Sequence, residues 1–190
     1  FSRDALLLEH VKLGQLRLNQ RDRDHLQALY DAEISYHDRH FGSILEGLER
    51  RGLMDETMVV ITSDHGEEFW DHGDFEHGHT LFSELIHVPL IVKAPRSLGL
   101  EARVVDAQVR VLDTLPTVFD LCGLPDPGTF SGSSLGALMQ GNSEARERPA
   151  FSEATLYGHE EISWRTERWH LILDTDPARA RPEILIDREG

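Results

Sequence analysis

Apolar side chains that recur at steps of three and four over residues 24–51 constrain the fold of this chain more than any other feature of its sequence. This spacing is typical of one face of an α-helix, and Gly52 lies where a helix C-terminal glycine is expected. At about 1.5 Å per residue, such a helix is roughly 40 Å long, which is enough to cross a whole β-sheet. A Leu-rich stretch in residues 1–20 predicts a second, shorter helix upstream.

Two short apolar runs after this helix predict strands. Residues 57–62 are apolar and β-branched without polar alternation, which is typical of a central strand covered on both faces. Residues 88–92 form the second run, and Pro89 suits the start of a strand or a sheet edge. Asp113 and Pro116 fit the cap and the first turn of a further helix. This order of elements predicts an α/β layer structure with right-handed crossovers.

The last part of the chain predicts a small antiparallel sheet, because short β-prone stretches alternate with turns there. The stretches are residues 150–153, 161–165, 169–173 and 184–186. The predicted fold class is therefore α/β, with a partial sheet flanked by helices and a small C-terminal antiparallel sheet. We predict that residues 1–145 form part of an α/β domain and that residues 146–190 form a small antiparallel subdomain packed on it.

The composition excludes several classes of partner and site. The 190 residues hold 34 acidic and 19 basic side chains, a formal net charge of -15, which argues against nucleic acid or an anionic membrane surface as the main partner. Apolar runs are only a few residues long, so we expect no segment to span a bilayer. Cys122 is the single cysteine, which excludes an internal disulfide framework and a Cys-based zinc site. We interpret it as a small buried side chain.

The segment from Asp64 to His87 concentrates the titratable side chains of the chain. It holds five histidines and seven carboxylates, and residues 52–92 contain no lysine or arginine. Carboxylates gathered without a local cation repel one another unless water or a metal compensates. Asp64 and His65 directly follow the first predicted strand, and ligands bind beyond the carboxyl ends of strands in α/β sheets. The pattern favours a divalent metal site of Asp oxygen and His nitrogen, with a solvated acidic loop as the alternative.

A run of motifs extends over residues 26–141 and resembles the sulfatase family of the alkaline phosphatase superfamily. The motifs are Ser63-Asp64-His65-Gly66-Glu67, Asp71-His72-Gly73, His77-Gly78-His79-Thr80-Leu81-Phe82, His87-Val88-Pro89-Leu90-Ile91-Val92, Asp113-Thr114-Leu115-Pro116-Thr117 and Gly123-Leu124-Pro125. The resemblance implies that the sheet is part of an alkaline-phosphatase-like sheet. It also implies a sulfuric ester hydrolase that acts on a small-molecule or carbohydrate sulfate ester.

The resemblance further implies roles for four residues. Sulfatases hold one divalent cation, commonly calcium, between two N-terminal Asp residues and a C-terminal Asp-Asn or Asp-His pair, which Asp64 and His65 match. The nitrogen ligand leaves manganese or zinc as alternatives. Some members have a lysine that assists the leaving group where this chain has His77, and His79 is the second candidate for that task. A histidine can supply a cation or a proton near neutral pH, although either side chain could instead pack the loop.

The chain departs from the family pattern in its nucleophile. Sulfatases convert a Cys or Ser in a Cys/Ser-x-Pro/Ala-x-Arg motif to formylglycine, and neither this motif nor the paired N-terminal Asp residues occur here. We therefore expect the chain to be the C-terminal half of a sulfatase, inactive alone, whose nucleophile and remaining metal ligands lie in a missing N-terminal half. Two alternatives stay open: a phosphate or phosphonate ester hydrolase or transferase of the same superfamily, and a non-catalytic acidic metal-binding or interaction domain.

Three other features could be mistaken for site residues. Residues 132–136 fit the G-x-S-x-G esterase pattern, but a Pro/Gly-rich loop precedes Ser134 where a nucleophile elbow needs a buried strand. His37 and His40 are expected on the surface of the long helix. Trp70 could line a substrate mouth or cover the acidic loop.

Overall fold

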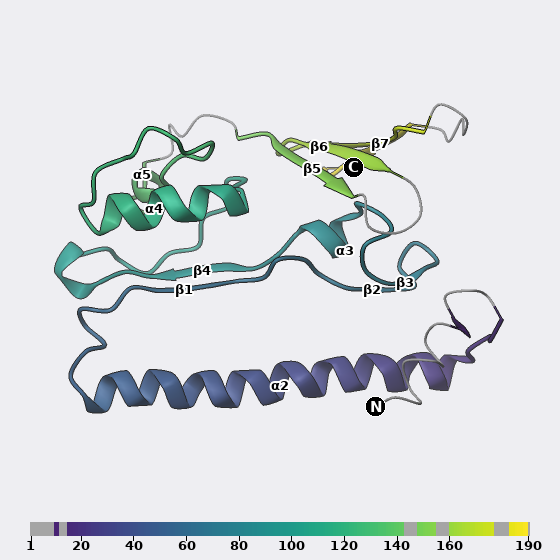
Figure 1. Cartoon of the computed structure of the whole chain (residues 1–190), viewed down its shortest axis with the longest axis horizontal. Coiled ribbons are helices and arrows are strands. Elements are labelled where there is room, and N and C mark those ends of the chain that lie inside the picture. The colour runs from purple at the N-terminus through teal and green to yellow at the C-terminus, as the bar shows by residue number, and fades with distance from the viewer. Residues whose placement is uncertain (1–9, 12–14, 143–147, 155–159, 177–182, 190) are drawn as a thin grey trace. The chain divides into compact units, whose positions relative to one another are not determined.

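A computed structural model describes residues 10–11, 15–142, 148–154, 160–176 and 183–189 of the chain (Figure 1). The chain divides into two compact units. The first comprises Phe1–Met54 and Glu67–Glu76, and the second comprises Asp55–Gly66 and His77–Gly190. The division into residues 1–145 and 146–190 stays a prediction. No helix within the described ranges has the length and apolar character needed to cross a bilayer.

The first unit is built on the long helix α2 (Gln20–Arg50), which confirms the prediction from the periodic segment. The helix begins slightly earlier than predicted because Asn19 and Asp22 form a capping box, in which each side chain accepts a hydrogen bond from the other residue's backbone N–H. Gly52 follows the C-terminal cap with φ of 67°, the left-handed conformation that favours glycine. The predicted helix in residues 1–20 lies largely outside the described residues.

A short hairpin completes the first unit. Its strands are β2 (Glu68–Phe69) and β3 (Phe75–Glu76), paired antiparallel. The Phe69 ring meets Tyr30 of α2 edge-on, with ring centroids 5.2 Å apart. Trp70 stacks on the Phe75 ring of β3 at 4.6 Å and lies below the Arg23 guanidinium of α2. These contacts match the interpretation of Trp70 as a cover for the acidic loop.

The second unit contains both predicted apolar strands, β1 (Val59–Thr62) and β4 (Leu90–Lys93). As predicted, β4 begins directly after Pro89. The two strands pair antiparallel from Val59 opposite Lys93 to Thr62 opposite Leu90, so the predicted right-handed crossover is wrong for this pair. The reason is that the chain returns through the short helix α3 (Ser83–Ile86) to the end of β1 that it left.

The predicted burial of β1 is also wrong. Within the described residues, β1 pairs with β4 alone, and Val59, Val60 and Ile61 are only half-buried. Strand propensity and apolar character were sufficient to predict the strand. They could not predict how many neighbours it has.

The helix α4 (Thr114–Leu121) follows the 3-10 turn η2 (Val111–Asp113), where the sequence predicted a helix start. Asp113 occupies the cap position, but its side chain does not cap the helix, which corrects that prediction. Cys122 ends α4 and is exposed rather than buried, because the helix terminates there.

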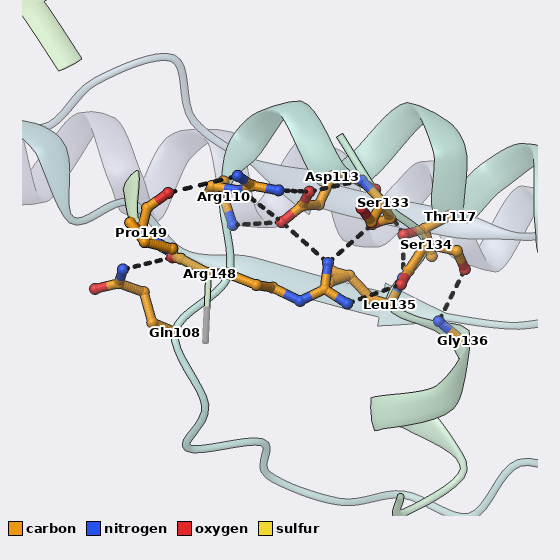
Figure 2. A network of polar contacts seen from close by, with 10 residues as sticks. All are labelled: Gln108, Arg110, Asp113, Thr117, Ser133, Ser134, Leu135, Gly136, Arg148 and Pro149. Atoms are coloured by element: carbon orange, nitrogen blue, oxygen red, sulfur yellow. Dashed lines mark hydrogen bonds and ion pairs between the residues drawn. The ribbon is translucent and has the colours of Figure 1, made fainter. Parts of the chain in front are cut away.

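Asp113 is instead the centre of a polar network (Figure 2). Its fully buried carboxylate accepts hydrogen bonds from the Arg110 guanidinium and the Ser133 backbone N–H, and Arg148 lies 3.5 Å from it. Thr117 donates its hydroxyl hydrogen to the Asp113 carbonyl oxygen at 2.6 Å. The network joins η2 and α4 to the loop before the short helix α5 (Gly136–Met139).

The C-terminal sheet is confirmed in all its predicted strands. They are β5 (Ala150–Ala154), β6 (Glu161–Arg165), β7 (Trp169–Asp174) and β8 (Ile184–Asp187), and each is antiparallel to the next. Alternate residues of β6 are buried, and all three of them, Glu161, Ser163 and Arg165, are polar. The Glu161 carboxylate accepts a hydrogen bond from the Leu81 backbone N–H at 3.2 Å, which fastens the sheet to the segment after His79.

Candidate metal and catalytic site

Asp64 lies just beyond the carboxyl end of β1, two residues after Thr62. Its side chain is 88% exposed. The Oδ1 atom accepts a hydrogen bond from the His65 backbone N–H at 3.1 Å, and Ser63 closes the turn by donating to the His65 carbonyl oxygen at 2.7 Å. Hydrogen bonds from the backbone N–H groups of Asp64 and His65, followed by the His65 charge, hold the pKa of the Asp64 carboxyl below its usual value. The carboxylate is therefore ionised and oriented by the backbone while it remains open to a ligand.

The His65 ring is oriented so that one nitrogen faces this carboxylate. Its Nδ1 atom lies 2.8 Å from the Gly66 carbonyl oxygen, which can only accept a hydrogen bond, so Nδ1 carries the hydrogen. The other ring nitrogen, Nε2, lies 3.8 Å from Oδ2 of Asp64 and would offer its lone pair to a cation in the neutral ring. Both atoms are compatible with one shared cation, because each would be about 2.0–2.6 Å from it.

His77 joins this pair in space although it is distant along the chain. Its ring stacks on the His65 ring with centroids 4.1 Å apart and planes inclined by 28°. Gly78 follows with φ of 83°, a conformation that side-chain-bearing residues rarely adopt. His79, the second candidate, is half-buried. The structure thus brings together Asp64, His65 and His77 of the predicted site.

Gly66 fixes the loop that presents these side chains. Its backbone N–H donates to the Leu85 carbonyl oxygen of α3 at 2.8 Å. A Cβ atom at this position would lie 1.9 Å from the Glu84 carbonyl oxygen, so no other residue could make the same approach. The turn after β1 is therefore tied to α3 by backbone contacts that require glycine.

Part of the acidic segment has a structural explanation that the sequence argument missed. The Glu68 carboxylate is fully buried and accepts hydrogen bonds from the backbone N–H groups of His72 and Asp74 at 3.0 and 2.9 Å. Asp71 accepts one from the Phe69 backbone N–H at 3.0 Å. Backbone donors stabilise these carboxylates, so the number of acidic residues alone does not require a cation.

Asp64 and His65 could supply only part of a metal shell. No group of three or more His, Cys, Asp or Glu side chains in the described part of the chain could hold a metal ion. Calcium takes about six to eight oxygen ligands, and even zinc takes about four. Asp64 and His65 therefore fit as two of the ligands of a divalent cation, and the remaining ligands would come from residues outside the described part of the chain.

The other candidate residues do not form a second catalytic site. No strand lies between α4 and Ser134 in the described residues, and the Ser134 hydroxyl donates to the Asp120 carboxylate, so the esterase pattern is structural here. His37 and His40 are exposed on α2, as predicted. Arg165 was not among the predicted site residues, although the alternation of Glu161, Ser163 and Arg165 along one predicted strand indicates that it shares a face with them.

The sequence profile of the sulfatase family matches residues 9–124 of this chain. The chain belongs to the sulfatase family. Arylsulfatase K from Mus musculus is 28% identical to it over 179 residues, which are 88% of this chain and 32% of the relative. An endo-4-O-sulfatase from Bacteroides thetaiotaomicron is 34% identical over 123 residues, which are 64% of this chain and 24% of the relative. These findings confirm the resemblance that the motifs indicated.

Solved structures confirm the predicted α/β fold class of this sulfatase-family chain. The phosphonate monoester hydrolase from Silicibacter pomeroyi superposes with a TM-score of 0.77 at 28% identity, and the match covers 93% of this chain and 37% of the hydrolase. The chain spans about a third of the length of the curated relatives that it matches.

Proposed function

We propose that this chain is the C-terminal part of a metal-dependent sulfatase that hydrolyses the sulfate ester of a small molecule or carbohydrate. Asp64 and His65 are its share of the metal ligands, with calcium as the expected cation and manganese or zinc as alternatives. The observation that supports this most strongly is the approach of His65 Nε2 to Asp64 Oδ2 at 3.8 Å, at the carboxyl end of a strand.

The two ligands are prepared for a cation before it binds. The Asp64 carboxyl has a lowered pKa and one oxygen held by the backbone, while the His65 ring, whose Nδ1 faces the Gly66 carbonyl oxygen, directs Nε2 toward the other oxygen. A bound divalent cation would supply positive charge that stabilises the sulfate oxygens during reaction. Asp64 and His65 would hold that cation at the end of β1.

His77 is the proposed proton donor to the leaving alcohol or phenol. Its ring is stacked on His65, so a proton donor would lie directly beside the ligand pair. Departure of the leaving oxygen develops negative charge, and a positioned acid lowers that barrier. His79 takes this role in the alternative assignment. The formylglycine nucleophile is expected in the part of the enzyme that precedes this chain.

The proposal is tested with the complete enzyme that contains this chain and an aryl sulfate substrate. We expect hydrolysis that stops when the metal is removed by a chelator and returns when calcium, manganese or zinc is restored. His65→Ala should bind the metal more weakly, whereas His37→Ala, an exposed histidine of α2, should hydrolyse the substrate like the wild type. Hydrolysis that is indifferent to both chelator and His65→Ala would contradict the proposal.

A phosphonate ester hydrolase is the second candidate, because a phosphonate monoester hydrolase matches 93% of the chain at 28% identity. A cation, two ligands and a proton donor would serve the phosphorus ester equally well. The two candidates are separated by comparing kcat/KM of the same enzyme for a nitrophenyl sulfate and a nitrophenyl phenylphosphonate. A higher value for the phosphonate would replace the sulfatase assignment.

A further inference from the structure

A cavity of about 920 Å³ lies within the second unit, a size typical of small-molecule sites. Residues from the end of β1, the start of β4, the segment before η2 and the C-terminal sheet line it. Its polar lining includes His87, Gln108, Arg165 and Arg188. None of these residues belongs to the proposed metal and catalytic site.

Arg165 is the unusual member of this lining. It occupies an inward position of β6 and is only 7% exposed, yet its guanidinium forms no hydrogen bond or ion pair with another described residue. Gln108 fixes the strand by donating its side-chain N–H to the Arg165 carbonyl oxygen at 2.8 Å. Burial of a charge without a partner is costly, and a guanidinium offers five N–H donors in a planar fork. The side chain is therefore held, charged and undersatisfied, against the cavity.

A second guanidinium, that of Arg188, adds positive charge near it. Burial lowers the pKa of the Arg165 guanidinium, and the charge of Arg188 lowers it further. Burial and the charges of Arg165 and Arg188 also lower the pKa of His87. Arg188 directs Nη1 to the carbonyl oxygens of Thr166 and Glu167 and has no ion pair among the described residues. Like charges gathered in this way favour an anion between them.

The carboxylates of the lining do not neutralise this charge. Asp106 and Glu167 are exposed, and neither forms an ion pair with Arg165 or Arg188 in the described structure. Arg110 also lines the cavity, but its guanidinium is already paired with Asp113 at 2.9 Å. The unpaired positive charge is thus concentrated on Arg165 and Arg188.

We propose that this cavity binds a small-molecule oxyanion, a sulfate or carboxylate group, on the Arg165 guanidinium with Arg188 beside it. The planar fork matches the two oxygens that either group presents. The proposal does not rest on Asp64 or His65 holding a cation, so either assignment can fail without the other.

The test measures thermal unfolding and calorimetric binding of the full 190-residue chain with sodium sulfate or sodium glucuronate. Sodium chloride at equal ionic strength is the reference, because sulfate also stabilises proteins without a site. We expect a saturable response to at least one oxyanion, and the stronger response identifies the preferred group. Arg165→Gln should weaken binding at least about tenfold, since hydrogen bonds to a charged group are strong. Arg168→Gln is the matched control, because Arg168 is exposed and already paired with Asp187.

A second variant keeps the test decisive if Arg165→Gln does not fold. Arg188→Gln alters an exposed side chain and should weaken oxyanion binding by a smaller factor. Asp64→Asn should bind the oxyanion like the wild type, which separates this site from the proposed metal site. The proposal is overturned if neither oxyanion acts beyond the chloride reference, or if folded Arg165→Gln and Arg188→Gln both bind like the wild type.

Discussion

Asp64 and Asp113 both have a carboxyl pKa below the usual value, but they differ in burial and in the arginine partners that only Asp113 has. Burial raises the pKa of Asp113, and hydrogen bonds from Arg110 and the Ser133 backbone N–H, with the charges of Arg110 and Arg148, more than offset it. Asp64 has an 88% exposed side chain, and chiefly backbone N–H groups lower its pKa.

The comparison separates a carboxylate that holds the fold from one that is available to a ligand. Protein donors surround the Asp113 carboxylate, which is inaccessible to solvent. Asp64 has one oxygen 3.8 Å from the His65 Nε2 atom and open to a ligand. A lowered pKa therefore does not identify a functional aspartate by itself; exposure and the remaining acceptor capacity do.

The largest expected effect concerns His77, the proposed proton donor stacked on His65. His77→Ala should lower kcat of the complete enzyme by about 10²–10⁴-fold for esters with poor leaving groups, because their leaving oxygen needs a proton. The loss should shrink for activated aryl esters, and the metal content should not change. Steady-state kinetics across a leaving-group series, with metal analysis, measure both.

The stacked geometry provides a control for this substitution. His77→Phe keeps an aromatic ring against His65 without a transferable proton, so it should lose kcat as His77→Ala does. A wild-type kcat in His77→Phe would assign the residue to packing. Equal losses for all leaving groups, or loss of the metal, would transfer the acid role to His79.

Asp113→Ala should lower the free energy of unfolding of the chain by about 3–5 kcal/mol, because it removes a buried carboxylate and leaves part-buried guanidinium and N–H groups without their acceptor. Asp64→Ala should change it by no more than about 0.5 kcal/mol, as expected for an exposed side chain. Urea denaturation of the two variants measures this difference. Equal destabilisation would remove the distinction between the two aspartates.

The two aspartates should also differ in acid. A carboxyl whose pKa is lower in the folded state stabilises the protein at pH values above its unfolded pKa. This stabilisation is lost as the pH falls through the folded pKa, which for Asp113 lies below the unfolded value of 3.8. Wild type should therefore lose stability below this pH, and Asp113→Asn should lose less over the same range. Asp64→Asn should nearly retain the wild-type slope. Unfolding curves at successive pH values test the order of the slopes.

The smallest expected signals come from the 190-residue chain alone. It should show no turnover of an aryl sulfate, since no residue in it has the role of the nucleophile. It should bind calcium weakly or not at all, because Asp64 and His65 are two of about six to eight expected ligands. A tight stoichiometric calcium site in calorimetry, or turnover that depends on Asp64, would contradict the two-ligand interpretation.

Local signals in the sequence predicted most elements of the fold. The periodicity over residues 24–51 predicted α2, and the β-prone stretches after residue 146 predicted all four strands of the C-terminal sheet. Two predictions were wrong: the direction of β4 relative to β1 and the burial of Cys122. The first depends on where the chain returns to the sheet and the second on where α4 ends, and local composition determines neither.

The sequence indicated candidate residues for the site but not their geometry. The motif around Asp64 and His65 and the position of His77 indicated the candidates, whereas the ring stacking depends on a loop held by Gly66 against α3. The Asp113 network was missed, because contacts between distant segments leave no periodic pattern in the sequence. The burial of Arg165 was missed although Glu161, Ser163 and Arg165 alternate along β6, because polar residues normally mark the exposed face of a strand.

The central claim is that Asp64 binds a metal and Asp113 does not, and the most direct measurement is the metal affinity of the complete enzyme carrying Asp64→Asn or Asp113→Asn. Substitution of Asp64 should weaken the affinity by more than about 100-fold, since even residues that only orient a ligand contribute about 10–100-fold. Folded Asp113→Asn should bind the metal like the wild type. Wild-type affinity in Asp64→Asn, or an equal loss in both variants, would contradict the account.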